Sequence, residues 1–343
     1  MKREQYIDVI KGISILFVIY YHFLIDGISF RESPTKEFFE TICMQLFFFV
    51  SGYLAYRSDR KYTWNYTKDA ILKKMRYILI PSILMFIFSI FYFGSDIRAC
   101  LTSDLKNGYW FTYVLFFIYV IFYLTSTLTR RDSSKSRLDI IFFGISIVIG
   151  FASVFVKYFD SQLVDILSLR RTMKFLMFFM LGYFYHKYCI YDFLKSKGML
   201  RGLFFILSLV PTHLIPESKF KYSVEFVVSI CRVLVCFYFF SYSDAFKLNN
   251  FVTTQLSLLG RHSLEIYFIH FYFLFGMPML LSYLQEQSFL FVGRGPGATF
   301  PIELLAILPL SVFIAYLCVL TRRLFDIFAP PISELFFGMI HKD

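Results

Sequence analysis

Charged residues are scarce in this sequence. Asp, Glu, Lys and Arg make up 17% of the 343 residues, whereas they make up about 25% of a typical soluble domain. Several long stretches contain none of the four, and the clearest are 77–95, 107–129, 140–156 and 304–321. Because a membrane span needs about 20 mostly apolar residues, this composition excludes an ordinary soluble domain and predicts a chain embedded in a membrane.

Long polar segments are missing as well. No loop between the apolar stretches is long enough to fold as a soluble domain of its own. We therefore predict one all-α domain over residues 1–343, a polytopic membrane helix bundle of about ten transmembrane helices. The predicted spans lie near 6–26, 37–56, 77–95, 108–129, 139–157, 172–189, 200–216, 222–243, 260–284 and 302–321.

The basic residues behind the net charge of +11 are distributed unevenly in this topology. The side that holds both termini carries 22 Lys and Arg, and the opposite loops carry 10. Because cytoplasmic loops collect Lys and Arg, both termini are predicted to be cytoplasmic. The charge then sets the orientation and attracts anionic membrane lipids, and no nucleic-acid partner is expected.

Patterns that would indicate a metal site or a disulfide framework are absent from the sequence. The six cysteines are scattered, mostly within the predicted spans, and no His-Glu-x-x-His segment occurs. We therefore expect no bound metal and no zinc protease. No small-residue cleavage site follows the apolar N-terminal stretch, so we expect it to persist as the first span.

The first predicted span nevertheless contains Asp8, Lys11 and His22. An ionisable side chain in the bilayer costs roughly 2.5–3.5 kcal/mol on insertion scales. At 100° per residue, all three lie on one side of a helix, with Lys11 and His22 about 16 Å apart along it. This stripe is predicted to face the polar interior of a bundle. Two interpretations stay open: charges that mark the membrane boundaries, or a catalytic stripe in which His22 exchanges protons near neutral pH.

Two later segments also place polar groups within predicted spans. Ser263, Tyr267 and His270 recur at spacings of four and seven residues, so they share one helical face. Arg232 lies midway along the eighth span, seven residues after Glu225. These side chains are candidates to line a polar cavity. An interhelical hydrogen-bond network without a ligand, or a structural ion pair in the case of Arg232, explains them equally well.

Six segments resemble, in order, the motifs of one known family. They are DVIKGISILFVIYYH (8–22), LFFFVSGYL (46–54), KKMRYILIP (73–81), YWFTYVLFF (109–117), FFMLGYFY (178–185) and LGRHSLEIYFIH (259–270). Together they resemble the integral-membrane acyltransferase-3 proteins, which O-acylate bacterial surface and secreted polysaccharides. In the first segment, Lys11 stands where arginine is usual, which keeps the charge but loses a bidentate contact. The segment 73–81 resembles the family's paired-arginine motif, with Lys73 at its first basic position and Arg76 at its second. Many members carry an extra soluble esterase-like domain, and we expect a stand-alone membrane domain here.

The resemblance implies an activity and a location. The protein would be a multi-pass protein of the bacterial cytoplasmic membrane. It would move an acyl group, by default acetyl, from cytoplasmic acyl-CoA to a hydroxyl of a cell-surface or secreted glycan or its lipid-linked precursor. Acyl-CoA is then a co-substrate, and no bound cofactor is expected. His22 is the candidate general base or acyl carrier, and Asp8 and Lys11 would orient donor groups or tune His22.

The phosphates of such a donor would meet basic groups on the cytoplasmic side. Lys73 and Arg76, at the end of the basic loop 57–76, are the candidate donor-binding residues, although this loop also satisfies the orientation rule by itself. Trp110 offers a flat face to a sugar or an adenine, or anchors the chain at the membrane boundary.

Two other classes compete with acyl transfer. A multi-span bundle with an ionisable stripe also fits a transporter or flippase of a glycan or another polar substrate, but we expect none of the interrupted helices typical of transporters. A membrane glycan polymerase or ligase would need a larger outer loop than the loops of about 20 residues that this chain has.

Overall fold

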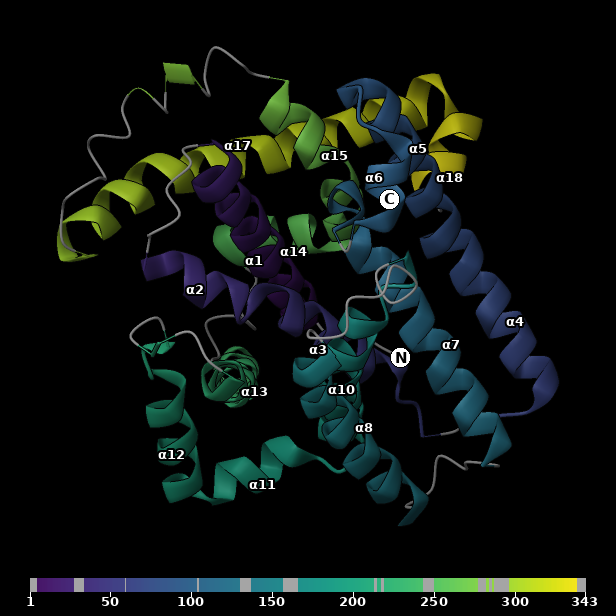
Figure 1. Cartoon of the computed structure of the whole chain (residues 1–343), viewed down its shortest axis with the longest axis vertical. Coiled ribbons are helices and arrows are strands. Elements are labelled where there is room, and N and C mark those ends of the chain that lie inside the picture. The colour runs from purple at the N-terminus through teal and green to yellow at the C-terminus, as the bar shows by residue number, and fades with distance from the viewer. Residues whose placement is uncertain are drawn as a thin grey trace. The chain divides into compact units, whose positions relative to one another are not determined.

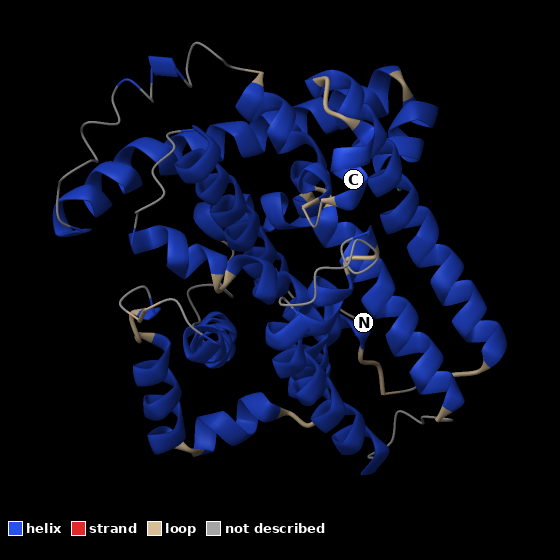
Figure 2. Ribbon diagram, viewed as in Figure 1, coloured by secondary structure: helices blue, strands red, loops and turns tan. Residues whose placement is uncertain are grey.

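A computed structural model describes residues 5–27, 34–58, 60–103, 105–129, 137–156, 166–212, 215–216, 219–242, 250–276, 282–283, 286 and 296–337. Within these ranges, the regular elements are helices, as the colouring of Figure 2 shows. The all-α prediction is therefore confirmed. The chain forms two compact units.

The first unit consists of Met1–Phe47, Met199–Glu217 and Val224–Ile327. It contains the helices α1 (Gln5–His22), α2 (Pro34–Glu40), α12 (Gly198–Ser208), α14 (Phe251–Arg261), α15 (Ser263–Phe275) and α17 (Pro296–Phe328), most of α13 (Lys219–Tyr242), the first residues of α3 (Cys43–Ala55), and a π-helical turn, η1 (Phe23–Gly27).

The second unit consists of Phe48–Gly198, Ser218–Ser223 and Phe328–Asp343. It contains the rest of α3 and the helices α4 (Trp64–Lys74), α5 (Ile80–Phe93), α6 (Ile97–Thr102), α7 (Trp110–Leu128), α8 (Arg137–Val156), α10 (Leu169–Lys187), α11 (Ile190–Ser196) and α18 (Pro330–Phe337). A second π-helical turn, η2 (Met75–Leu79), joins α4 to α5, and a short 3₁₀ turn, η3 (Lys106–Gly108), precedes α7.

Six helical segments of the described residues are long and apolar enough to cross a membrane. They are Gln5–Asp26, Thr35–Ala55, Trp64–Phe93, Trp110–Leu128, Phe220–Ser241 and Leu304–Phe328. Shorter apolar helices cover Asp139–Ser153, Gly198–Ser208 and Ser263–Phe275, where three further spans are predicted, and α10 covers most of a fourth. The number of ten spans and the cytoplasmic position of both termini stay predictions.

The distribution of side chains is that of a protein surrounded by lipid. Large apolar side chains are exposed along α5, α8, α12 and α17. Charged groups lie inside instead, and among them Lys187 forms a buried ion pair with Asp139. An apolar exterior around paired interior charges is what a hydrocarbon environment requires.

Two glycines bring α1 against α14 in the first unit (Figure 1). A Cβ atom on Gly12 would lie 2.0 Å from the carbonyl oxygen of Leu256, and one on Gly260 would lie 1.7 Å from that of Asp8. Only glycine permits so close an approach of two backbones. Because Gly260 is three residues before Ser263, this contact also places the start of α15 beside α1.

The second unit uses the same device between α3 and α10. A Cβ atom on Gly52 would lie 1.8 Å from the carbonyl oxygen of Phe179, and one on Gly182 would lie 1.9 Å from that of Phe49. Both glycines belong to segments quoted above for their family resemblance, 46–54 and 178–185. The resemblance in these two segments therefore has a packing reason.

The segment formed by α4, η2 and α5 runs antiparallel to α7 in the second unit (Figure 1). Thr67 and Thr127 share a buried hydrogen bond of 2.5 Å at one end. Ser82 and Thr112 share one of 2.7 Å further along. These polar pairs fix the register of the two long helices, since hydroxyl groups in an apolar bundle are costly without partners.

The second predicted span lies within the segment Thr35–Ala55, which contains a two-residue turn between two helices. α2 ends at Glu40 and α3 begins at Cys43. At this break, the side-chain amide of Gln45 donates a hydrogen bond of 2.9 Å to the carbonyl oxygen of Glu40. A side chain thus satisfies a carbonyl group at the end of α2, where regular helical bonding stops.

Candidate functional site

His22 is the last residue of α1, directly before the π-helical turn η1. Its Nδ1 atom lies 2.8 Å from a carboxylate oxygen of Asp26, four residues further on. Because an ionised carboxylate only accepts hydrogen bonds, the pair fixes the proton on Nδ1 and leaves Nε2 as the basic nitrogen. π-Helical turns occur often at functional sites, and this one carries the partner of His22.

His270 from α15 lies against His22. The two imidazole rings have centroids 5.4 Å apart. The Nδ1 atom of His270 faces the carbonyl oxygens of Ile266 and Tyr267, at 3.1 and 2.9 Å. It therefore donates to its own helix, and Nε2 points away from that backbone. This Nε2 is buried and has no hydrogen-bond partner among the described residues. The structure thus places two imidazoles side by side, each with its Nδ1 atom hydrogen-bonded, so that Nε2 is the basic nitrogen of each neutral ring.

Ser263 and Tyr267 share the buried face of α15 with His270, as their spacing predicts. Ser263 begins the helix, and the ring of Tyr267 lies 6.1 Å from that of His270. All three side chains are buried within the first unit. The segment 259–270 therefore places three polar side chains on one helical face, and the last of them, His270, lies beside His22.

Asp8 and Lys11 lie at the other end of α1. The Lys11 ammonium is 3.7 Å from the Asp8 carboxylate, which is buried. Eleven residues of helix separate Lys11 from His22, about 16 Å. The structure therefore pairs Asp8 with Lys11 and keeps both apart from His22.

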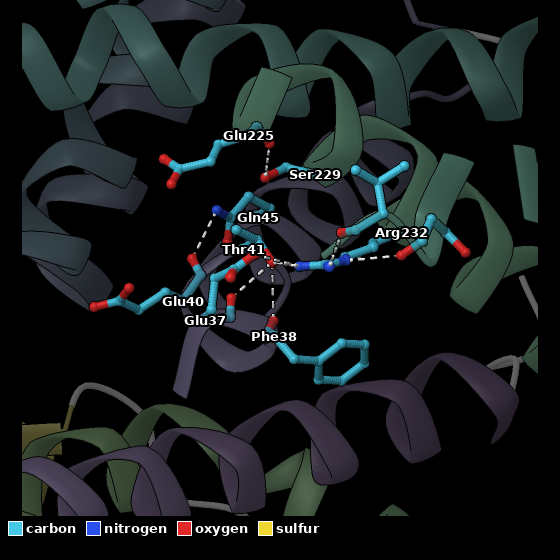
Figure 3. Close-up of polar contacts among 10 residues, drawn as sticks. Glu37, Phe38, Glu40, Thr41, Gln45, Glu225, Ser229 and Arg232 are labelled. Atoms are coloured by element: carbon cyan, nitrogen blue, oxygen red, sulfur yellow. Dashed lines mark hydrogen bonds and ion pairs between the residues drawn. The ribbon is translucent and has the colours of Figure 1, made fainter. Parts of the chain in front are cut away.

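Arg232 is buried in α13 and bonded on several sides, as Figure 3 shows. It donates to the carbonyl oxygens of Ser208 and Val210 at 3.0 and 3.1 Å, and to the hydroxyl of Thr41. The Glu37 carboxylate lies 3.8 Å away. The guanidinium thus holds the carbonyl groups at the end of α12 to the break between α2 and α3.

Lys73 and Arg76 lie in the second unit, at the end of α4 and in η2. Both side chains are exposed. Arg76 forms an ion pair of 2.5 Å with Glu334 of α18, which packs along α5. Two basic groups at an exposed helix end have the charge and reach to hold the phosphates of a nucleotide.

Trp110 begins α7 and stacks on Phe175, with ring centroids 5.3 Å apart. The guanidinium of Arg171 lies 4.3 Å above its ring, a cation–π contact. Trp110 is two residues before Thr112, whereas Arg76 is six residues before its partner Ser82. Because these helices are antiparallel, Trp110 and Arg76 lie about eight residues, or 12 Å, apart along the bundle.

Three charged residues of the first unit that contact other charged groups were not predicted from the sequence. Asp26 was missed because it lies at the edge of the predicted span, although its spacing of four from His22 was a usable signal. Arg322 and Glu265 are buried. The Arg322 guanidinium lies 3.3 Å from Asp326 and also interacts with the Glu265 carboxylate. These charges lie in α15 and α17, next to or within predicted spans.

The chemistry that this arrangement can perform is proton transfer. A carboxylate, an imidazole oriented by it and a second imidazole within ring contact are the parts of a general acid–base site. Among the described residues, no group of three or more His, Cys, Asp or Glu side chains is arranged to hold a metal ion.

A family model described as an acyltransferase domain matches residues 4–320 of this chain. The chain belongs to the acyltransferase-3 family. No curated protein and no solved structure matches its sequence. The family and the long apolar helices together identify a multi-pass membrane acyltransferase.

The part of this acyltransferase-3 protein that matches the family includes every predicted site residue and Asp26. Arg322 and Glu334 follow the matched residues. The ion pair between Arg76 and Glu334 therefore joins a residue within the matched domain to one beyond it.

Proposed function

We propose that the protein is an O-acyltransferase of the bacterial cytoplasmic membrane. It moves an acyl group, by default acetyl, from acyl-CoA on the cytoplasmic side to a hydroxyl of a cell-surface or secreted glycan or its lipid-linked precursor. The hydrogen bond of 2.8 Å between His22 and Asp26, beside His270, is the observation that carries this proposal. Acyl transfer to a hydroxyl needs a base of this kind.

In the proposed reaction, His22 acts as the general base. Its Nε2 takes the proton of the acceptor hydroxyl while the hydroxyl oxygen attacks the thioester carbonyl carbon. The carbon–sulfur bond then breaks, and the proton passes from Nε2 to the sulfur of CoA, which leaves as the thiol. Asp26 keeps the imidazole in the required tautomer and stabilises the imidazolium formed in between.

Lys73 and Arg76 are proposed to bind the phosphates of the donor. Their exposed position at the end of the basic loop 57–76 supports this assignment. Lys11, paired with Asp8, is a further cation for the donor, and Trp110 provides a flat face for a ring. Both termini are proposed to be cytoplasmic, since the charge distribution of the loops favours that orientation.

The proposal is tested with purified protein in nanodiscs and acetyl-CoA labelled in the acetyl group. We expect wild-type protein to release CoA and to transfer label to a glycan acceptor, and His22→Ala to lose both. His186→Ala is the matched control, because His186 is a half-buried histidine of the second unit. Wild-type activity in His22→Ala would contradict the role of His22, and label retained on His22 would make it an acyl carrier instead of a base.

The interruption between α2 and α3 favours a second candidate, transport of a polar substrate, because transporters build their binding sites at broken helices. An experiment with the same protein in sealed vesicles distinguishes transport from acyl transfer. Uptake of a labelled oligosaccharide without consumption of acetyl-CoA or longer acyl-CoAs would replace acyl transfer by transport.

A further inference from the structure

A group of polar side chains beside His22 joins α1 to α2. The hydroxyl of Tyr21 donates a hydrogen bond of 2.8 Å to Glu40, and the ammonium of Lys36 lies 3.9 Å from the same carboxylate oxygen. The ring of Tyr21 meets that of His22 edge-on at 5.4 Å. The carboxylate of Asp26 also interacts electrostatically with the Tyr21 hydroxyl. We call these five residues the α1–α2 polar cluster.

The α1–α2 polar cluster is partly exposed and lies beside the buried His270. The side chain of Glu40 is 44% exposed, that of Asp26 35% and that of His22 22%, whereas His270 is 0% exposed. The buried Nε2 of His270 has no partner among the described residues. A buried polar atom without a hydrogen bond is costly. The Nε2 atom of His270, beside the cluster, would therefore gain a hydrogen bond from a bound polar molecule.

The backbone that carries Glu40 is held firmly. The ring of Phe39 packs on those of Phe17 and Tyr20 at 4.8 and 4.9 Å. Next to it, Arg232 binds the hydroxyl of Thr41, and Figure 3 shows the Glu40 side chain directed away from that arginine. A carboxylate on so fixed a segment suits the recognition of one geometry, because little order is lost when a ligand binds.

Resting on the proposed acyl transfer, we propose that the α1–α2 polar cluster binds the acceptor, and that this acceptor is a neutral, polyhydroxylated sugar. Glu40 and Tyr21 are its specificity-determining residues. Because the phenol donates its proton to Glu40, the phenol oxygen and the carboxylate act as acceptors, which suits neighbouring sugar hydroxyls that donate. A sugar held there presents one hydroxyl to Nε2 of His22.

The charge of the cluster favours a neutral sugar over an acidic one. Asp26 and Glu40 are negative, Lys36 is positive and His22 is neutral when it acts as a base, so the cluster carries one net negative charge. An acidic sugar would bring a second negative charge toward Asp26 and Glu40, which repel it.

The test compares two acceptors with the full-length protein in nanodiscs and labelled acetyl-CoA. The probes are diacetylchitobiose, a neutral disaccharide, and digalacturonate, an acidic one. For each, the rate of transfer to the sugar is divided by the rate of CoA release into water. We expect Tyr21→Phe and Glu40→Gln each to lower this ratio about tenfold or more for the neutral probe, as the loss of a hydrogen bond to a charged group does. Asp192→Asn, an exposed carboxylate of the second unit, should keep the wild-type ratio.

The possible results distinguish a wrong acceptor assignment from a wrong proposed function. A wild-type preference for digalacturonate, CoA release without transfer to the neutral probe, or unchanged ratios in both variants would overturn the acceptor assignment alone. Equal losses of transfer and hydrolysis, together with a lower melting temperature, would show that the pair of Tyr21 and Glu40 only holds α2 in place. Failure of wild-type protein to release CoA would instead overturn the proposed function, and the acceptor assignment with it.

Discussion

Among the described residues, each unit has a π-helical turn, and the two turns use the same backbone geometry for different purposes. In the first unit, η1 follows His22 and brings Asp26 to its half-buried imidazole. In the second, η2 carries Arg76, whose exposed guanidinium meets Glu334 from a distant part of the chain. Each turn lies within or at the end of a long apolar segment and carries a charged side chain, Asp26 in η1 and Arg76 in η2.

The difference lies in burial and in the range of the contact. A local, half-buried pair fixes a tautomer and keeps its partner dedicated to one nitrogen. An exposed ion pair contributes about 0–1 kcal/mol, so Arg76 can exchange Glu334 for a ligand at little cost. We infer that η1 serves proton transfer and η2 serves exchangeable binding of an anion. The predictions below test this contrast.

The largest effect is expected from Asp26→Asn. The amide keeps the shape of the carboxylate but can donate to Nδ1, which would move the imidazole proton to Nε2 and remove the base. We expect kcat to fall about 100-fold at neutral pH, within the range that general-base catalysis contributes. Steady-state kinetics with acetyl-CoA measure it, and Asp192→Asn, which changes an exposed carboxylate of α11, is the control. Activity within twofold of wild type would remove Asp26 from the site.

A smaller effect, on the scaffold that brings His270 to His22, is expected from Gly260→Ala. The added methyl group would lie 1.7 Å from the carbonyl oxygen of Asp8, so α14 must move away from α1. We expect a loss of about 1–3 kcal/mol of stability, as overpacking costs, together with reduced activity.

The matched control for this change is Gly144→Ala. Gly144 lies in α8, and a Cβ atom there meets nothing within 4 Å. Thermal unfolding in detergent should show a lower melting temperature for Gly260→Ala and an unchanged or higher one for Gly144→Ala. Equal behaviour of the two variants would show that α1 and α14 are not closely packed.

Much of this arrangement follows from local sequence patterns. The apolar runs predict the helices, and the spacing of Ser263, Tyr267 and His270 predicts their shared face. The stripe containing His22 is likewise a property of one helix. Such predictions succeed because helical periodicity relates residues only a few positions apart.

The remaining features depend on contacts between distant segments. Nothing local to His22 indicates that His270, 248 residues later, lies beside it. The pairing of Arg76 with Glu334 and the binding of Arg232 to Thr41 are equally non-local. The π-helical turns were not predicted either. An extra residue in a turn rotates the following side chains by about 100°, but a nearly continuous run of apolar residues does not record that rotation.

The η2 side of the comparison is sharpened by Arg76→Ala. If Arg76 binds a donor phosphate, we expect KM for acetyl-CoA to rise about tenfold, as the loss of one charge-assisted contact does, with a smaller change in kcat. Arg76→Lys should recover part of the loss because the charge returns without the bidentate geometry. The same KM for wild type and Arg76→Ala would leave Arg76 with Glu334 as a structural pair only.

The smallest effect is expected from Glu334→Gln, and it has the opposite sign. Removing the carboxylate frees Arg76 from its exposed partner, which holds it by up to about 1 kcal/mol. If donor and Glu334 compete for the same guanidinium, KM for acetyl-CoA should fall by up to about fivefold at low ionic strength. The difference should vanish near 1 M salt, where the screening length is about 3 Å. A rise in KM would show that Glu334 orients Arg76 for the donor instead of competing with it, and that both π-helical turns then work by the same principle, a carboxylate that positions its basic partner.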